Sequence, residues 1–247
     1  MGSKFPLVKL KDISLKITKG STPTQKDGGF SNDGIHFIKA ESASYDGVLD
    51  ESKFVFVTEE VHAKYKRSQL AEKDILFSMA GAFLGKTGFI EKKHLPANTN
   101  QALALIRIDY NLANPKYVLY CLQQRRIVHF VNNSSSQSAQ PNINLQQIGD
   151  LDIEFPDRET QDSIVNILES VDKKTSVNKQ TNQTLEQMAQ TLFKSWFVDF
   201  DPVIDNALAA GNPIPDELAA RAEVRRQALA NGTANREAAK AAAAANE

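Results

Sequence analysis

The sequence predicts an α+β domain in residues 1–156, one long helix in residues 157–200 and a C-terminal segment in residues 201–247. Before Pro156, short runs rich in β-branched and aromatic residues alternate with Gly, Asn, Asp and Pro, a pattern typical of strands and turns. After Pro156, the chain contains no glycine and no proline as far as Phe200, so no residue obliges a helix to stop.

The first region contains stretches with the length and composition of strands. They are residues 53–60, 75–81, 87–92, 103–109 and 150–156. Residues 114–133 differ, because apolar side chains there recur at approximately helical spacing. Asn114 followed by Pro115 predicts an N-cap and the first helical position, and Asn132 and Asn133 mark the end of this single helix.

An apolar seam runs along residues 157–200. Its members recur every seven residues, with further apolar residues beside them: Ile164, Val171, Asn178, Leu185 and Leu192, flanked by Ile167, Leu168, Met188 and Trp196. A helix of about 40 residues is roughly 60 Å long, whereas a domain of about 150 residues is roughly 30–40 Å across. We therefore expect the helix to project and to pack against another helix, with Asn178 fixing the register. The alternative is two ordinary helices with a break near residues 178–182.

The C-terminal segment begins at Asp201 and Pro202. Residues 211–232 predict a proline-rich turn and a short amphipathic helix. The last residues, 236–247 (REAAKAAAAANE), are alanine-rich and of low complexity, and we expect them to be frayed or disordered.

Composition and charge exclude several classes of protein. The net charge of −1 is unevenly divided, because residues 1–155 carry 19 basic and 16 acidic residues whereas residues 156–247 carry 10 and 14. A mildly basic first region permits nucleic-acid binding through a local patch without requiring it. The single cysteine, Cys121, excludes an internal disulfide and cysteine-rich zinc sites, and it suits a reducing cytoplasm. No apolar run reaches the roughly 18–20 residues that span a bilayer.

The sequence shows no set of residues typical of a catalytic or metal site. The four histidines are scattered and lack the spacing of metal ligands. Neither a G-x-S-x-G nucleophile elbow nor a G-x-G-x-x-G dinucleotide motif occurs. We therefore predict no catalytic residue and no metal site.

Residues 80–88 (AGAFLGKTG) fit a relaxed phosphate-loop pattern in which alanine replaces the first glycine. A phosphate loop must lead into a helix whose N-terminus faces the phosphates. Here Thr87 is followed by Gly88, an apolar pair and, soon afterwards, Pro96, which leaves no room for that helix. A strand–turn–strand loop is the better interpretation, and a nucleotide hydrolase is kept as the enzymatic alternative.

Several stretches together point to one family. Residues 8–42 contain the turn GSTP and the strand entry DGIHFI, residues 73–90 form a strand–glycine turn–strand pattern, and Asn100-Gln101 precedes the strand LALIRI. The most specific stretch is residues 134–168, which join the first region to the long helix. Its most informative residues, by their type and spacing, are Gln140, Ile143, Leu145, Ile148, Leu151, Ile153, Pro156, Gln161 and Ile164. Together with FKSWFVDFDPV and AGNPIPDELAARAE further on, all these stretches resemble parts of the DNA-specificity subunits of type I restriction–modification systems.

The resemblance implies a target-recognition domain that reads a few base pairs, followed by a helix that sets the spacing between two half-sites. Members of that family contain two domain–helix units whose helices pair antiparallel, whereas this sequence contains one. We therefore expect a homodimer formed through an antiparallel coiled coil, which would read an interrupted palindrome.

The resemblance also implies the partners and the chemistry that this chain lacks. Double-stranded DNA, modification (methyltransferase) subunits and restriction (translocase–nuclease) subunits are the expected partners, in a prokaryotic cytoplasm. The chain itself is then not an enzyme. No cofactor is expected in it, because the methyl donor, ATP and magnesium would belong to the partner subunits.

Contact with bases and phosphates requires amide, hydroxyl and cationic groups on loops. Residues 19–26, 80–87, 96–101 and 132–142 form such loops, and residues 64–67 form a basic cluster. The predicted DNA-binding residues are Lys19, Ser21, Thr22, Gln25, Lys26, Lys64, Lys66, Arg67, Ser78, Lys86, Thr87, Asn98, Thr99, Gln101, Ser136, Gln137, Gln140 and Asn142. Lys86 is the best candidate for a phosphate contact, because glycines beside it let the backbone approach closely. For each loop the alternative is an ordinary solvated turn.

The residues predicted to contact a second copy or another partner lie on the long helix. They are Ile164, Val171, Asn178, Leu185, Met188, Leu192, Trp196 and Phe197. Phe193, Trp196, Phe197 and Phe200 share one helical face, which is predicted to pack on a domain or on the second copy, with docking of a modification subunit as the alternative. For the whole chain, the competing hypothesis is a coiled-coil adaptor that binds only protein.

Overall fold

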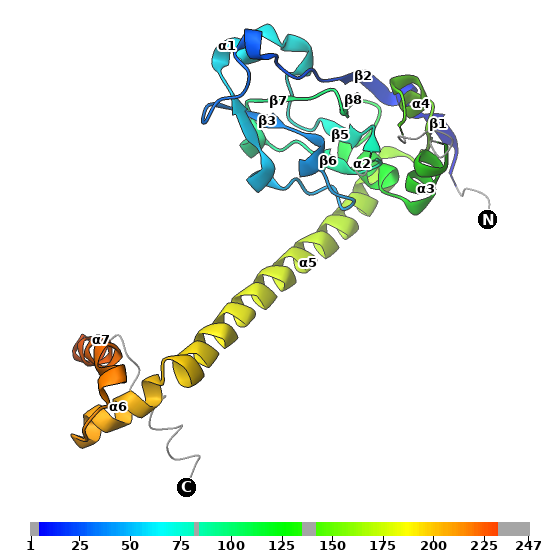
Figure 1. Cartoon of the computed structure of the whole chain (residues 1–247). Coiled ribbons are helices and arrows are strands. Elements are labelled where there is room, and N and C mark those ends of the chain that lie inside the picture. The colour runs from blue at the N-terminus through cyan, green and yellow to red at the C-terminus, as the bar shows by residue number, and fades with distance from the viewer. Residues whose placement is uncertain (1–4, 82–83, 135–141, 232–247) are drawn as a thin grey trace. The chain divides into compact units, whose positions relative to one another are not determined.

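The computed structural model describes residues 5–81, 84–134 and 142–231. The chain forms two compact units, residues 1–169 and residues 170–247. Among the described residues, the first unit contains the strands and the start of the long helix, and the second contains the rest of that helix and two shorter ones (Figure 1). The first unit extends beyond Pro156 because the first turns of the long helix bury Val165 in its core.

Three small sheets form the framework of the first unit. The largest has the antiparallel order β2-β8-β5-β6, and the second has the order β4-β3-β7, in which β3 and β7 are parallel. The third pairs β1 with β9. The strands are β1 Leu7–Lys9, β2 Ser14–Lys19, β3 Ile35–Ile38, β4 Val55–Val57, β5 Ile75–Ser78, β6 Thr87–Phe89, β7 Ala97–Thr99, β8 Leu103–Ile108 and β9 Asp152–Glu154.

Each stretch predicted as a strand from residue types contains one, namely β4, β5, β6, β8 and β9. The strand β3 was expected from the resemblance alone, and β1, β2 and β7 were not singled out as strands. Strands β5 and β6 pair antiparallel, and Gly81 and Gly85, which lie between them in the chain, have φ of 68° and 79°. Thr87 begins a strand and not a helix, so the phosphate-loop interpretation is wrong.

The first unit also holds the helices α1 Glu59–Lys64, α2 Pro115–Leu122, α3 Arg125–Ser134 and α4 Leu145–Gly149. The prediction of a single helix over residues 114–133 is wrong, because the chain breaks between α2 and α3. In one straight helix, Ile127 would point about 140° away from Leu122. The break lets both side chains enter the same core. The N-cap prediction is confirmed, since the Asn114 side chain accepts a hydrogen bond from the backbone of Lys116.

Strand β8 lies inside the largest sheet and is buried along its length, except at Arg107. An arginine in such a strand is explained by Asp74, whose carboxylate is fully buried. Arg107 Nε and Nη2 each donate to this carboxylate at 2.7 Å, and the backbone N–H of Ala71 donates to it at 2.7 Å. The Arg107 guanidinium therefore compensates the buried charge of the Asp74 carboxylate, which would be very costly if it were unpaired.

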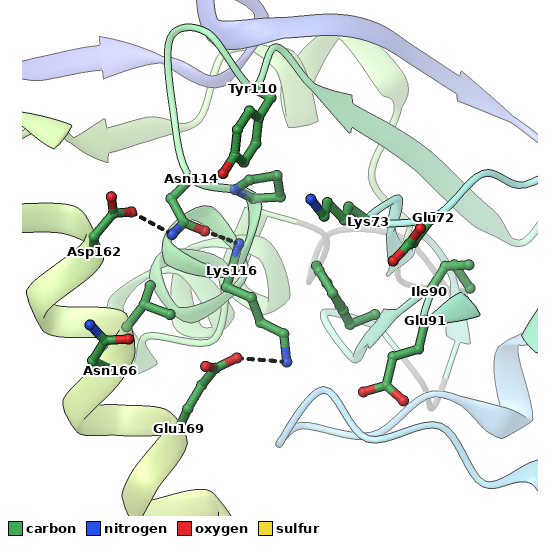
Figure 2. Close-up of a pocket in the computed structure, with 13 residues that line it drawn as sticks. Glu72, Lys73, Ile90, Glu91, Tyr110, Asn114, Lys116, Asp162, Asn166 and Glu169 are labelled. Atoms are coloured by element: carbon green, nitrogen blue, oxygen red, sulfur yellow. Dashed lines mark hydrogen bonds and ion pairs between the residues drawn. The ribbon is translucent and has the colours of Figure 1, made fainter. Parts of the chain in front are cut away.

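The long helix α5 runs from Arg158 to Phe193, and its first turns are anchored to the first unit. Asn114 Nδ2 donates to Asp162 Oδ1 at 2.7 Å, and Lys116 forms an ion pair with Glu169 at 3.3 Å, as Figure 2 shows. The helix continues without interruption through residues 178–182, so the alternative with a break there is wrong.

After α5 a π-helical turn, Lys194–Val198, leads to Phe200, which has a positive φ of 53°. The helices α6 Asp201–Ala210 and α7 Ala219–Ala230 follow, the second at the predicted amphipathic helix. Arg221 donates twice to the buried Asp201, at 2.7 and 2.8 Å, and Arg225 pairs with Asp205. These ion pairs tie α7 to α6 and fix the fold of the second unit.

We expect the contact between α6 and α7 to weaken at low pH. Burial alone would raise the pKa of Asp201, but the hydrogen bonds from Arg221 and Ser195 outweigh it and hold that pKa below its usual value. Because the folded pKa is lower than the unfolded one, the stabilisation is complete above about pH 4 and is lost as the pH falls through the folded pKa. Amide hydrogen exchange of α7 as a function of pH measures this loss. An Asp201→Asn variant should exchange faster at neutral pH and show little of the acid transition; parent-like exchange in that variant would contradict the assignment.

Candidate nucleic-acid interface

Three of the polar segments singled out in the sequence lie together on the first unit. Arg67 Nη2 donates to Ser21 Oγ at 3.0 Å, and the backbone N–H of Ser21 donates to the Thr99 carbonyl at 3.1 Å. Thr22 Oγ1 donates to Gln101 Oε1. The loop 19–26, the basic cluster 64–67 and the segment 96–101, which contains β7, therefore form one surface, which we call the polar surface.

Asp27 joins two parts of the polar surface. Its carboxylate accepts hydrogen bonds from Lys64, from Tyr65 Oη at 2.6 Å and from Thr24 Oγ1 at 2.7 Å. These hydrogen bonds, the one from Lys64 above all, lower the pKa of Asp27 well below its usual value. The carboxylate stays ionised at neutral pH and holds the loop 19–26 against the end of α1.

Most of the predicted DNA-binding side chains are accessible. Those exposed to solvent are Lys19, Thr22, Gln25, Lys26, Lys64, Lys66, Arg67, Gln101 and Asn142, and those half-buried are Ser21 and Lys86. They supply cationic groups for phosphates and amide and hydroxyl groups for base edges, the chemistry by which proteins read DNA.

The predicted roles of Ser78, Thr87, Asn98 and Thr99 in DNA contact are wrong for this structure, because all four side chains are buried. They belong to β5, β6 and β7 rather than to loops. Asn98 Nδ2 donates to the Tyr65 carbonyl at 3.2 Å, and Thr99 Oγ1 donates to the Ile38 carbonyl at 2.9 Å. Their polar groups therefore hold neighbouring segments together. Ser136, Gln137 and Gln140 lie outside the described residues.

The turn that carries Lys86 lies beside a tyrosine that the sequence did not indicate. The Lys86 ammonium lies 5.5 Å from the centre of the Tyr45 ring, and Tyr45 Oη donates to the Leu84 carbonyl at 3.3 Å. Half of the Tyr45 side chain is exposed. A backbone bridge between Ser44 and Thr87 joins these distant segments, and no local sequence pattern reports such a bridge.

A row of apolar side chains on α5 and the π-helical turn is exposed to solvent. The apolar row consists of Val171, Leu185, Met188, Leu192, Trp196 and Phe197, with exposed fractions of 42–63%. Asn178 is exposed within the same stretch. Ile164 was predicted to belong to this row, but it is half-buried against the core of the first unit. Its contact is therefore with its own domain.

The part of the chain that the structure describes lacks the features of a metal site and of a membrane-spanning helix. It contains no group of three or more histidine, cysteine or carboxylate side chains placed to hold a metal ion. Nor does it contain a helix with both the length and the apolar character needed to cross a membrane.

The model of the type I restriction modification DNA specificity domain matches residues 3–187. This chain belongs to that family. The chain is 33% identical over 155 residues to the HindI specificity subunit of Haemophilus influenzae, covering 62% of this chain and 34% of that subunit. It is 24% identical over 219 residues to the MjaIX specificity subunit of Methanocaldococcus jannaschii, covering 88% of this chain and 49% of that subunit. The chain thus spans between a third and half of the length of these relatives.

Solved structures of the family share the fold. The HsdS subunit from Thermoanaerobacter tengcongensis matches with a TM-score of 0.54 and 14% identity, over 79% of this chain and 49% of that one. An S subunit from M. genitalium matches with a TM-score of 0.53 and 16% identity, over 84% and 50%. These likenesses confirm the predicted fold class, a mixed α/β domain with small sheets followed by a long helix.

Proposed function

We propose that this specificity-family chain recognises a DNA sequence and carries no catalytic activity of its own. The match to the family over residues 3–187 carries the proposal. The polar surface supports it, because the structure joins three separate polar segments into one region that holds Lys66, Arg67 and Gln101. Such a surface offers cations for the DNA backbone and an amide for a base edge.

Two copies of the chain would pair through the apolar row. Within the row, Val171 and Leu185 lie at equal distances from Asn178, seven residues on either side of it. If two α5 helices lie antiparallel with their Asn178 residues at the crossing, Leu185 of each copy meets Val171 of the other. A symmetric dimer presents two identical recognition domains, and it would therefore read an interrupted palindrome.

The remaining parts of the proposal concern partners. In the prokaryotic cytoplasm the dimer would carry modification (methyltransferase) and restriction (translocase–nuclease) subunits. Phe193 at the end of α5 and Phe200 after the π-helical turn are both exposed and lie outside the apolar row, and they offer these subunits a docking surface. The methyl donor, ATP and magnesium would be bound by those subunits, and this chain would determine only where they act.

Selection from random DNA duplexes tests the proposal. The chain, assembled with its methyltransferase partner, is incubated with a random library, and the bound duplexes are sequenced. We expect an enriched site with two half-sites of inverted symmetry and a fixed spacer. No enrichment, with assembly intact, would favour the adaptor that binds only protein. Two unrelated half-sites would contradict the homodimer and leave DNA recognition standing.

Removal of Lys66 should weaken DNA binding about equally for all sequences. This exposed lysine belongs to the polar surface, and a lysine on a phosphate contributes to affinity through counterion release. We expect Lys66→Ala to reduce the slope of log K against log salt by about 1 per copy. Fluorescence anisotropy between low and moderate salt measures the slope. Lys173→Ala, which removes a lysine from α5 outside the polar surface, is the control and should keep the parent slope; an equal change in both variants would contradict the assignment.

A further inference from the structure

The start of α5 is attached to the first unit through a buried amide. Gln161 is only 1% exposed, and both ends of its side-chain amide are used. The backbone N–H of Asn114 donates to Gln161 Oε1 at 2.9 Å, and Gln161 Nε2 donates to the Pro156 carbonyl at 3.0 Å. One side chain therefore links the helix to the segment before it and to the loop before α2.

A second set of contacts surrounds this amide. Arg158 Nη1 donates to the Tyr110 carbonyl at 2.8 Å, and its guanidinium lies 4.4 Å from the centre of the Tyr110 ring. The Lys73 ammonium lies 4.7 Å from the same ring centre. Asp162 accepts hydrogen bonds from Asn114 Nδ2 at 2.7 Å and from Arg158 Nε at 3.0 Å. We call these contacts and those of Gln161 the α5 anchor; Figure 2 shows how Tyr110, Asn114 and Asp162 lie in it.

Strand β8 connects the α5 anchor with the polar surface. Gln101, which belongs to the polar surface, lies just before the strand, and Tyr110 and Asn114 follow it. The strand is hydrogen-bonded on both sides, to β2 and to β5. A six-residue strand held in this way is about 20 Å long and cannot bend freely. The direction of the first turns of α5 is thus fixed relative to the surface proposed to read DNA.

We propose that Gln161 and Tyr110 are positioning residues that let the assembled complex discriminate the length of the spacer between two half-sites. The proposal rests on the proposed function. Its physical basis is that a small change in the direction of a helix at one end displaces residues far along it by a large distance. A tilt of about 10° at Arg158 displaces Asn178, roughly 30 Å further along, by about 5 Å. This displacement exceeds the 3.4 Å rise of one base pair. A loosened anchor should therefore accept spacers that the parent rejects.

The test uses the chain assembled with its methyltransferase partner and the site obtained by selection. Duplexes carry the two half-sites with spacers from two base pairs shorter to two base pairs longer than the selected one. Gln161→Leu keeps the volume and removes both hydrogen bonds. Tyr110→Leu changes a side chain that is 55% exposed and removes the ring on which Arg158 and Lys73 stack. It therefore decides the question even if Gln161→Leu fails to fold.

We expect the ratio of affinities between the selected spacer and spacers one base pair longer or shorter to fall at least about fivefold, the scale of one lost hydrogen bond. Affinity for a duplex with a single half-site should stay near that of the parent, because the polar surface is unchanged. Gln183→Leu, the same substitution at an exposed position on α5, is the control and should keep the parent ratio.

The outcomes are distinguishable. A parent complex that selects a bipartite site, with Tyr110→Leu showing an unchanged spacer ratio, overturns the positioning role and leaves the proposed function intact. A parent complex that selects no sequence overturns both. A fall in affinity for single half-sites equal to the fall for bipartite sites would also contradict the positioning role, since it would show damage to the reading surface itself.

Discussion

A Leu185→Lys variant is expected to sediment as a monomer at concentrations at which the parent chain is a dimer. Leu185 is 57% exposed in the described chain and would be covered by the second copy in the proposed antiparallel pair. Burial of a leucine contributes about 1.5–3 kcal/mol, and a symmetric dimer contains the residue twice. A loss of about 3–6 kcal/mol raises the dissociation constant by roughly 10²–10⁴. Analytical ultracentrifugation over a range of concentrations measures it.

Gln183→Lys provides a matched control for this prediction. It introduces the same charge two residues away on α5, at an exposed position that is not part of the apolar row. The control should remain a dimer. If both variants dimerise like the parent, or if the parent itself is a monomer at micromolar concentration, the pairing through the apolar row is wrong. A monomeric Leu185→Lys variant should also lose its preference for bipartite sites over single half-sites.

The second large effect is expected from Asp74→Ala, which should destabilise the first unit by about 3–5 kcal/mol. The substitution leaves the Arg107 guanidinium at the sheet without its carboxylate, and it leaves the backbone N–H of Ala71 without its acceptor. The cost arises from unpaired polar groups rather than from lost apolar burial. Amide hydrogen exchange of β5 and β8 reports the loss of stability, because Arg107 lies in β8, Asp74 directly precedes β5, and both strands exchange through opening of the first unit.

An exposed ion pair on the same unit provides the comparison. Asp152 pairs with Lys9 at 2.7 Å, and both side chains are more than 40% exposed. Asp152→Ala should therefore cost about 0–1 kcal/mol. Equal effects of the two substitutions would show that burial of Asp74 does not determine the strength of its contribution. A double variant that replaces Asp74 and Arg107 with leucine and methionine should recover much of the loss, since no charge is then left unpaired.

Local patterns in the sequence predicted the elements whose cause is local. The run LALIRI has the residues of a buried strand and forms β8, and Asn114 with Pro115 has the chemistry of a helix start and begins α2. Helix α5 runs unbroken from Arg158 to Phe193, and no glycine or proline there stops it. In each case the side chains that decide the structure are neighbours in the chain.

The elements that escaped prediction depend on distant partners. Residues 96–101 look like a polar loop, but Ala97–Thr99 pairs with β3, about sixty residues earlier, and this pairing buries Asn98 and Thr99. The same reason explains why the candidate site was only partly predicted. The sequence identified the exposed loop residues by their chemistry, yet it could not show that Ser21, Arg67 and Thr99 lie together, because their contacts join separate segments.

The pairing of β1 with β9 has a consequence for synthesis of the protein. Leu7 pairs with Glu154, so β1 can form its pairing only after residues near the end of the domain have been synthesised. At roughly 5–20 residues per second, the ribosome needs about 7–30 s to make the intervening chain. During that time the backbone groups that β9 later pairs lack this partner. Closure of the domain therefore coincides with emergence of the segment that leads into α5.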